Sequence, residues 1–345
     1  MNLDRSCLSS PDPPALENSL LGICIPTYKR PDQLQLCVRS VIAAAAPFHV
    51  SIFIADDSAD DTNTEAIAAL QARYPHIKHE RNPQNLGIDR NILHCADLCP
   101  CDYAWLLGED DRLLPEAVAS VLQVLDKSSP AFLAVNYSSV NEEVSLIIKE
   151  KLMDISVDTE RSAEDFLRRE APAIGFIGSC VVNKALWDTI DPAPYLDTYF
   201  AHVGRILASV AGKRVFLIAR PLVLNRAGGA AAFTWSSDAY GVYTGWAKVI
   251  RRLEPLYSAA VCAECIEAFD RLHGLSTVRF MMAKRADCVY NLDIYRKFIQ
   301  RSDRGRGYKL LARLVAGVPP ILFQVLHGLL SRVRQRRNRQ VELHI

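Results

Sequence analysis

The chain has 345 residues, half of them apolar, and its 40 Lys and Arg residues nearly balance 39 Asp and Glu residues. A chain of this size can bury a full core, with room for one domain and an extension, and a net charge of +1 by itself selects no class of partner. Because the first residues include Asp4 and Arg5 but no apolar run, we expect no signal peptide and reduced cysteines in the cytoplasm.

Short apolar runs alternate with helical periodicity through the first hundred residues. This alternation predicts an α/β fold with a Rossmann-like, doubly wound and mostly parallel sheet. Ligands bind beyond the carboxyl ends of the strands in such sheets, and polar clusters follow the expected strands here. No G-x-G-x-x-G follows the first strand, which disfavours a nicotinamide-dependent oxidoreductase. The expected strands are 21–25, 50–55, 77–80 and 103–107.

The fourth expected strand ends in three consecutive acids, Glu109, Asp110 and Asp111. Adjacent carboxylates repel one another and need positive charge between them. Mg²⁺ or Mn²⁺ would meet this need, since both prefer oxygen ligands and Mg²⁺ commonly shares substrate phosphates. The alternative is a solvated acidic turn before a helix that starts near Pro115.

Four motifs in this order resemble the signatures of family 2 glycosyltransferases, which have the GT-A fold. The resemblance covers roughly residues 19–225. The run W-L-L-G-E-D-D and a later F-I-G-S-C-V-V-N-K-A-L-W (176–187) are most similar to the abequosyltransferase-like branch, whose members build bacterial surface polysaccharides. The four motifs are I-P-T-Y-K-R-P (25–31), A-D-D-S-A-D-D (55–61), N-L-G-I-D-R-N (85–91) and L-G-E-D-D (107–111).

The resemblance implies a site for a nucleotide-diphosphate sugar. Pro26, Thr27 and Tyr28 would border the base, and Arg30 would lie near the phosphates. Asp56 matches a carboxylate that accepts a hydrogen bond from a pyrimidine. Arg90 matches a position that contacts the phosphate or ribose. The full expected set is Pro26, Thr27, Tyr28, Arg30, Asp56, Asp57, Asn85, Gly87, Arg90 and Asp110.

The resemblance also implies a Mg²⁺ or Mn²⁺ site. Asp111 matches the direct metal ligand, with Asp110 beside it. The usual D-x-D motif would place its first Asp at position 108, where this chain has Gly108. Glu109 compensates for the missing carboxylate, or the metal rests on fewer protein ligands, which Mg²⁺ tolerates because it retains waters and binds diphosphate oxygens.

The general base is the least constrained residue. The family is inverting, so the resemblance implies one base on the acceptor side, in many relatives the Asp of an E-D pair before an A-G-x-R segment. Ala211–Arg214 matches A-G-x-R, but no E-D pair precedes it. His202 is one candidate, because its ordinary pKa lies near neutrality, and Asp197 is the rival. A helix histidine bonded to a backbone carbonyl is the alternative interpretation of His202.

The second half of the chain is harder to interpret. We expect strands at 132–137, 145–148, 176–182 and 215–219, and helices after Trp235. His94, Cys95, Cys99 and Cys101 do not have standard zinc spacing. The expected organisation is an N-terminal disordered segment (1–18), the GT-A domain (19–228), a helical extension (229–305) and an amphipathic membrane-associating helix with a basic tail (306–345).

The last forty residues are strongly basic. Nine Lys or Arg and no acid lie between Arg304 and Arg339, and the uncharged stretch 314–330 is interrupted by Pro319 and Pro320. This pattern favours a kinked helix in the plane of an anionic membrane surface over a spanning helix. The alternative is a packed C-terminal helix and a disordered tail. Nucleic acid is disfavoured, because no aromatics are interleaved with the basic run.

Together these features predict a glycosyltransferase, peripheral on the cytoplasmic face of the cell membrane. It would move a sugar from a nucleotide-diphosphate donor to a lipid-linked oligosaccharide in O-antigen or exopolysaccharide biosynthesis. One alternative is a non-catalytic nucleotide-sugar-binding or scaffold protein of a polysaccharide assembly complex. Another is a sugar nucleotidyltransferase, which would need a Gly-rich phosphate loop after the first strand, where Pro26-Thr27-Tyr28 stands instead.

Overall fold

The computed structural model describes residues 18–226, 238–274, 277–300 and 304–325. It separates into two compact units. The first comprises residues up to 161 with 176–190 and 213–227, and the second comprises 162–175, 191–212 and the chain from 228 onward. Two segments within the predicted GT-A domain, 162–175 and 191–212, group with the helices that follow that domain.

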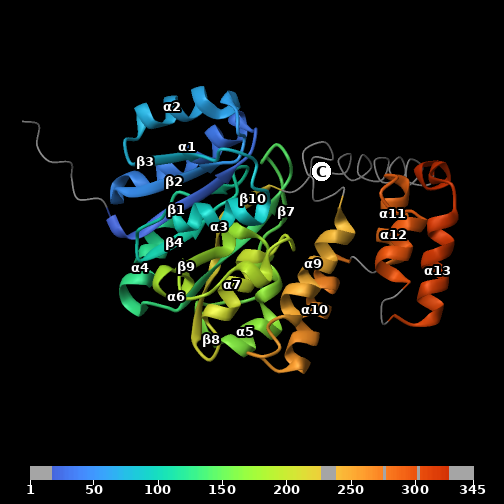
Figure 1. Ribbon diagram of the computed structural model, residues 1–345. Helices are drawn as coiled ribbons and strands as arrows, with labels where there is room; N and C mark the ends of the chain where they lie inside the picture. The colour runs from blue at the N-terminus through green and yellow to red at the C-terminus, as the bar shows by residue number, and fades with distance from the viewer. Residues whose placement is uncertain (1–17, 227–237, 275–276, 301–303, 326–345) are drawn as a thin grey trace, which may run out of the picture. The chain divides into compact units, whose positions relative to one another are not determined.

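The first unit is built on one sheet (Figure 1). Its strand order is β3-β2-β1-β4-β9-β6-β10-β5, with β7 paired to β6 and β8 paired to β10. The first four strands run parallel, as the sequence predicts. The strands are β1 (Asn18–Thr27), β2 (Val50–Asp56), β3 (Ile77–Arg81), β4 (Tyr103–Leu106), β5 (Arg112–Leu113), β6 (Phe132–Val140), β7 (Ile147–Lys149), β8 (Thr159–Ser162), β9 (Cys180–Asn183) and β10 (Arg214–Arg226).

Local sequence explains the helices between these strands. Helix α1 has Pro31 at its first position, where a missing N–H costs nothing, and its apolar residues recur at helical spacing on the buried side. Helix α3 follows Gly87, whose φ of +81° is a conformation that L side chains rarely adopt. The helices of this unit are α1 (Pro31–Ala45), α2 (Thr64–Arg73), α3 (Ile88–Asp97), α4 (Ala117–Ser128) and α6 (Lys184–Trp187).

The strand expected at 176–182 is shorter in the structure. Residues Ile177–Ser179 form the 3-10 helix η4, and β9 begins at Cys180. Two contacts of Gly178 accompany this turn: Trp105 Nε1 donates to the Gly178 carbonyl at 2.9 Å, and a Cβ at Gly178 would meet the Phe176 ring at 2.5 Å. β9 lies antiparallel between β4 and β6, so this part of the sheet is mixed.

The second unit is helical, in agreement with the expectation for the chain after Trp235. Helices α5 and α9 both pack against α10, and Trp246 of α9 stacks on Phe269 of α10, with ring centroids 4.3 Å apart. Its helices are α5 (Ala163–Arg169), η3 (Ala171–Gly175), η5 (Ala193–Tyr195), α7 (Ala201–Ser209), α9 (Ala239–Arg251), α10 (Ala259–His273), α11 (Val278–Ala286), α12 (Leu292–Ile294), η6 (Tyr295–Ile299) and α13 (Arg306–Gly317).

The C-terminal region is only partly described. Helix α13 ends at Gly317, Val318 and Pro319 are not helical, and residues 320–325 are again helical. Within the described ranges, no helix is both long and apolar enough to cross a bilayer. The predicted N-terminal segment up to residue 17 and the basic tail from residue 326 lie outside the described residues.

Candidate functional site

The acidic run after β4 does not project into solvent; it is tied to the end of β1. Thr27 Oγ1 donates to Glu109 Oε2, and the Tyr28 backbone N–H donates to the same oxygen at 2.9 Å. Burial raises the pKa of Glu109 to about 7. Glu109 therefore joins the carboxyl ends of two neighbouring parallel strands, which is where a doubly wound sheet places its ligand site.

Asp110 lies between two guanidinium groups. Its Oδ2 atom is 3.4 Å from Arg30 Nη1 and 3.4 Å from Arg226 Nη2. Arg226 is the last residue of β10, and its side chain is only 5% exposed. Part of the positive charge that the acidic run needs thus comes from the protein itself.

Asp111 is the most deeply held of the three acids. Its Oδ1 atom accepts from the Arg226 backbone N–H at 3.2 Å and from Asn225 Nδ2 at 3.3 Å. Burial, followed by the neighbouring charge of Asp110, raises its pKa well above the usual range. A cation bound beside Asp111 would stabilise the charged form of this buried carboxylate.

Gly108 replaces the first Asp of the usual D-x-D for a steric reason. A Cβ at position 108 would lie 2.4 Å from Asp111 Oδ2, closer than real Cβ contacts come. The Asp111 carboxylate occupies the space that a side chain at 108 would need. The departure from the motif is therefore coupled to the buried position of Asp111.

Asp56 forms a second polar centre at the end of β2. Its Oδ1 atom accepts from Ser58 Oγ at 2.6 Å, from the Ser58 N–H at 3.0 Å and from Asn63 Nδ2 at 3.0 Å. Its Oδ2 atom has no hydrogen-bond partner within the described part of the chain and faces His79 Nε2 at 3.9 Å. Asn63 Nδ2 also reaches Thr27 Oγ1 at 3.4 Å, which links this centre to Glu109.

Asp57 has a different surrounding. It accepts from the backbone N–H groups of Leu86 at 2.7 Å and Gly87 at 3.0 Å. These contacts hold the turn that leads into α3, and Asn85 Oδ1 adds a bond to the same Gly87 N–H at 2.9 Å. The side chains of Asn85 and Arg90 are exposed beside this turn. Asp57 and Gly87 thus shape the site without offering free acceptor atoms.

The two candidate bases differ sharply in exposure. His202 is fully buried on α7, its Nε2 lies 3.2 Å from the Ile174 carbonyl, and desolvation lowers its pKa to about 4. This is the carbonyl-bonded helix histidine considered as the alternative above. Asp197 is exposed and has a left-handed φ of 59°, a conformation that non-glycine residues seldom adopt.

No group of three or more His, Cys, Asp or Glu side chains in the described part of the chain is arranged to hold a metal ion. Cys95, Cys99 and Cys101, which lack standard zinc spacing, are buried free cysteines. A divalent cation at the acidic run would rest on Asp110 and Asp111, with the remaining positions filled by water or phosphate oxygens.

Three contributors to this site have no motif in the sequence. Arg226 and Asn225 are more than a hundred residues from Asp111, and β10 places them there by pairing with β5 and β6. Asn63 is an ordinary residue at the start of α2. Only the pairing of distant strands identifies these side chains, so periodicity and motif spacing could not have found them.

Part of the chain is similar in sequence to known proteins. The model of the family described as Glycosyl transferase family 2 matches residues 22–186. The abequosyltransferase RfbV of Salmonella typhimurium is 29% identical over 223 residues, which cover 60% of this chain and 66% of RfbV. The chain thus spans just under two thirds of the length of this relative.

Solved structures give the same fold. A crystal structure of S. aureus TarS matches with a TM-score of 0.57 and 12% identity, over 86% of this chain and 53% of TarS. TarS 1-349 in complex with UDP-GlcNAc matches with a TM-score of 0.55 and 12% identity, over 82% of each chain. At such identity the likeness concerns the fold alone, and it confirms the predicted GT-A-like architecture.

The family match covers the first three polar strand ends, the acidic run and the segment up to β9. Residues 22–186, just under half of the chain, therefore form a glycosyl transferase family 2 domain.

Proposed function

We propose that this protein is a glycosyltransferase of bacterial surface polysaccharide synthesis. It transfers a sugar from a nucleotide-diphosphate donor to a lipid-linked oligosaccharide of the O-antigen or exopolysaccharide type. The observation that carries the proposal is the joining of Thr27, Arg30, Arg226 and the acids 109–111 at one edge of the sheet. The names of two relatives, an abequosyltransferase and TarS in complex with UDP-GlcNAc, point to the same chemistry.

The donor nucleotide lies along the ends of β1, β2 and β4. The Asp56 Oδ2 atom, which accepts no hydrogen bond from any described residue, accepts from the base once the His79 ring turns aside. Arg30 and Arg226 face the diphosphate, because both guanidinium groups already lie at the acidic run. The charge that develops on the leaving diphosphate is then stabilised by groups that are in place before the reaction.

Asp110 and Asp111 would hold Mg²⁺ or Mn²⁺. Two adjacent carboxylates, one with a strongly raised pKa, fit a cation that also takes phosphate oxygens. When bound, the metal supplies further stabilisation of the leaving diphosphate. Asp110 would exchange part of its contact with Arg30 and Arg226 for the metal, which frees these guanidinium groups for the phosphates.

An inverting transfer needs one base for the acceptor hydroxyl. The hydroxyl oxygen attacks the anomeric carbon, the bond from that carbon to the diphosphate breaks, and the hydroxyl proton passes to the base. Of the two candidates, the exposed Asp197 suits this role better than His202. The buried His202 ring cannot meet a hydroxyl without leaving its place against Ile174.

The acceptor is proposed to be lipid-linked and the enzyme peripheral on the cytoplasmic face of the membrane. A chain that works on such an acceptor must stay at the bilayer surface. Support comes from the basic C-terminal region, of which residues 304–325 are described.

Calorimetric titration with UDP, CDP, GDP and dTDP, each with and without Mn²⁺, tests the proposal. We expect one nucleotide to bind with metal dependence, and Asp110→Asn to weaken that binding by at least tenfold. Asp126→Asn, an exposed carboxylate of α4 outside the four motifs, is the matched control and should bind as the wild type does. Failure of all four nucleotides to bind would refute the proposal. Binding without hydrolysis or transfer would favour the non-catalytic alternative.

A further inference from the structure

Large apolar side chains are concentrated on the outside of the C-terminal helices. Leu310 is 61% exposed, Leu314 is 59% exposed and Ile321 is 59% exposed. Leu311, Leu322 and Val325 extend this row, which we call the apolar row (310–325). Exposed apolar surface of this kind, rimmed by charge, marks a site of membrane or protein association.

The packing of α13 explains why these side chains point outward. Its inner side consists of the small residues Ala312, Val315 and Ala316, which lie in a core with Met281 and Tyr290. The Tyr290 hydroxyl donates to the Ala312 carbonyl at 3.0 Å and fixes this side of the helix. Helix α13 thus has two apolar sides. One is buried in this core, and the other is not covered by any described residue.

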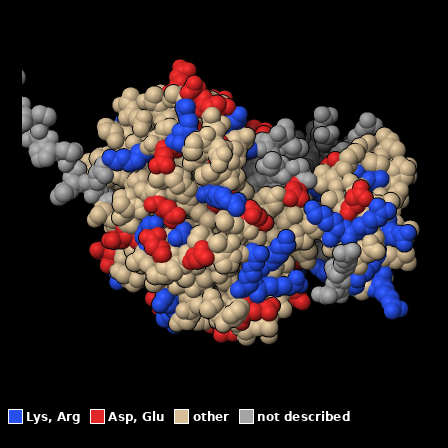
Figure 2. Space-filling view, in the orientation of Figure 1, with Lys and Arg blue, Asp and Glu red and all other residues tan. Residues whose placement is uncertain are grey.

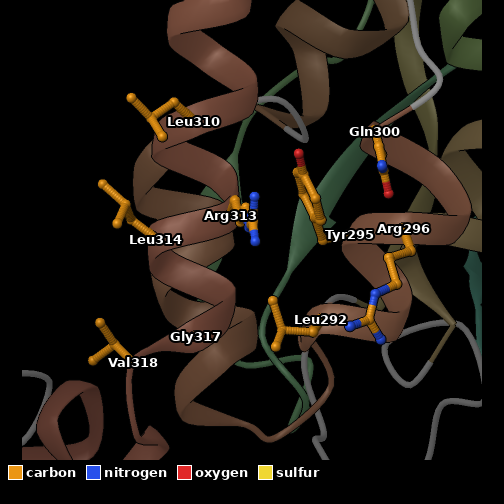
Figure 3. Close-up of a pocket in the computed structure, with 9 residues that line it drawn as sticks. All are labelled: Leu292, Tyr295, Arg296, Gln300, Leu310, Arg313, Leu314, Gly317 and Val318. Atoms are coloured by element: carbon orange, nitrogen blue, oxygen red, sulfur yellow. The ribbon is translucent and has the colours of Figure 1, made fainter.

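A cavity of about 630 Å³ opens between α13 and the segment formed by α12 and η6 (Figure 3). We call it the α13 groove. Its apolar lining includes Leu292, Leu310, Leu314 and Val318, and its charged lining is Arg296 and Arg313. In Figure 3, Arg313 extends from α13 toward the ring of Tyr295. No Asp or Glu lines the groove.

Charge around the groove is one-sided. Lys and Arg side chains gather on the part of the chain formed by α11–α13 (Figure 2). Between residues 292 and 325 the described residues include six basic side chains, at 296, 297, 304, 306, 309 and 313, and a single acid, Asp293. Asp293 pairs with Arg296 at 2.9 Å, whereas no described carboxylate lies within ion-pair distance of Arg313.

We infer that the α13 groove binds the phosphate headgroups of anionic phospholipids, with the apolar row lying in the acyl boundary of the same leaflet. Aliphatic residues beside Arg313, which no described carboxylate neutralises, and Arg296, which is paired with the exposed Asp293, match an amphiphile that carries a phosphate. Arg is well suited to phosphate. The helix lies in the membrane plane, since α13 has only twelve residues. The inference extends the proposed membrane association to a defined site that includes α12 and η6, outside the segment 306–345.

Flotation of the full-length protein with lipid vesicles tests the inference. One set of vesicles is phosphatidylcholine alone, and the other is phosphatidylcholine mixed with phosphatidylglycerol. We expect binding to the mixed vesicles only, weakened by added salt. Each basic residue near an anionic surface contributes about fivefold, so R296Q/R313Q should reduce partitioning roughly 30-fold. L310S/L314S should reduce binding at every salt concentration.

Matched variants on the sheet unit serve as controls. R214Q/R220Q removes two exposed arginines from β10, and L146S/I148S removes two side chains that are 64% and 60% exposed. Both pairs should float as the wild type does. If they reduce flotation as much as the groove variants do, binding is non-specific and the inference is wrong.

Two further results would overturn the inference. One is equal flotation of wild type and R296Q/R313Q on mixed vesicles. The other is a concentration-dependent dimer, seen by light scattering and abolished by L310S/L314S, which would assign the apolar row to a second copy of the chain. Nucleotide titration of the same variants separates the two proposals: it should be unchanged, whatever the vesicles show.

Discussion

At the scale of single residues, the acidic run is a set of coupled positions. Glu109 holds β1, Asp110 meets two arginines and Asp111 fills the space above Gly108. Each side chain therefore limits what its neighbours can be. This coupling makes the glycine at 108 a requirement of the arrangement, where the motif alone would suggest a lost ligand.

Gly108→Ala tests this coupling. The new Cβ would lie 2.4 Å from Asp111 Oδ2, so the carboxylate must leave its bonds to Arg226 and Asn225. We expect a loss of about 1–3 kcal/mol in the free energy of unfolding and weaker metal-dependent nucleotide binding. Denaturant melts and calorimetry measure the two effects.

Gly307→Ala is the control, because a Cβ there meets nothing within 4 Å. This control should leave stability unchanged or slightly improved. Wild-type stability and binding in Gly108→Ala would show that position 108 tolerates a side chain.

Glu109 should make stability depend on pH. Its folded pKa of about 7 lies above the ordinary value of 4.5, so the native state binds the proton more tightly than the unfolded state. Native stability must then fall as pH rises from 4.5 through 7. The whole effect amounts to on the order of 3 kcal/mol.

Glu109→Gln removes this titration and keeps an acceptor for the Tyr28 N–H. Relative to the wild type, the variant should gain stability across that pH range, as measured by urea unfolding at a series of pH values. A constant difference between the two proteins from pH 4.5 to 7 would contradict the assignment.

At the scale of elements, long-range strand pairing brings the site together. β10 runs parallel to β6 and pairs antiparallel with β5, which carries Arg226 and Asn225 to the acidic run. Arg226 Nη1 also lies 3.7 Å from Glu142, at the start of the hairpin between β6 and β7. Helix α7 carries His202 as a packing residue, whereas Asp197 lies in the exposed segment before that helix.

The two candidate bases predict different results on substitution. Asp197→Asn should lower kcat by roughly 10²–10⁴-fold with little change in nucleotide affinity or stability. His202→Asn should reduce stability, because it removes the bond to Ile174 and leaves a gap in a closed core.

The pH dependence of His202 has the opposite sign to that of Glu109. Its folded pKa of about 4 lies below 6.5, so the unfolded state binds the proton more tightly and wild-type stability falls as pH drops from 6.5 toward 4. His202→Asn should lose this dependence. If kcat falls in His202→Asn while stability and its pH profile stay as in the wild type, His202 is the base.

At the scale of the whole molecule, the proposed binding sites are distributed over two compact units. The sheet unit contains the acidic run and every proposed nucleotide contact, and the helical unit contains Asp197 and the α13 groove. Each unit has its own buried core, so ligand effects on stability should be separable.

Differential scanning calorimetry with the cognate nucleotide tests this division. At about a hundred times its Kd, a ligand adds roughly 2.7 kcal/mol to the unit that binds it, which raises Tm by roughly 5–10 °C for a domain of this size. We expect this shift in the transition of the sheet unit and its loss in Asp110→Asn. An equal shift of all transitions would mean that the two units unfold as one.

Much of the first unit could be predicted from the sequence because its signals are local. Apolar runs bounded by polar clusters gave the positions of β1 to β4, and helical periodicity gave α1 to α3. The positions of Thr27, Arg30 and Asp110 at one edge follow from parallel strands alone. The 3-10 turn at 177–179 escaped prediction, because it depends on a bond from Trp105, more than seventy residues away.

The sequence by itself determined the α/β class, the parallel half of the sheet, the resemblance to family 2 glycosyltransferases and the acidic run that marks the site. Only the tertiary structure decided that Arg226 and Asn225 complete the site, that His202 is buried and that the apolar row remains exposed. The physical reason is the sequence separation of the residues that interact. Strand periodicity and motif order are set by neighbouring residues, whereas burial and charge pairing depend on which distant segments fold against each other.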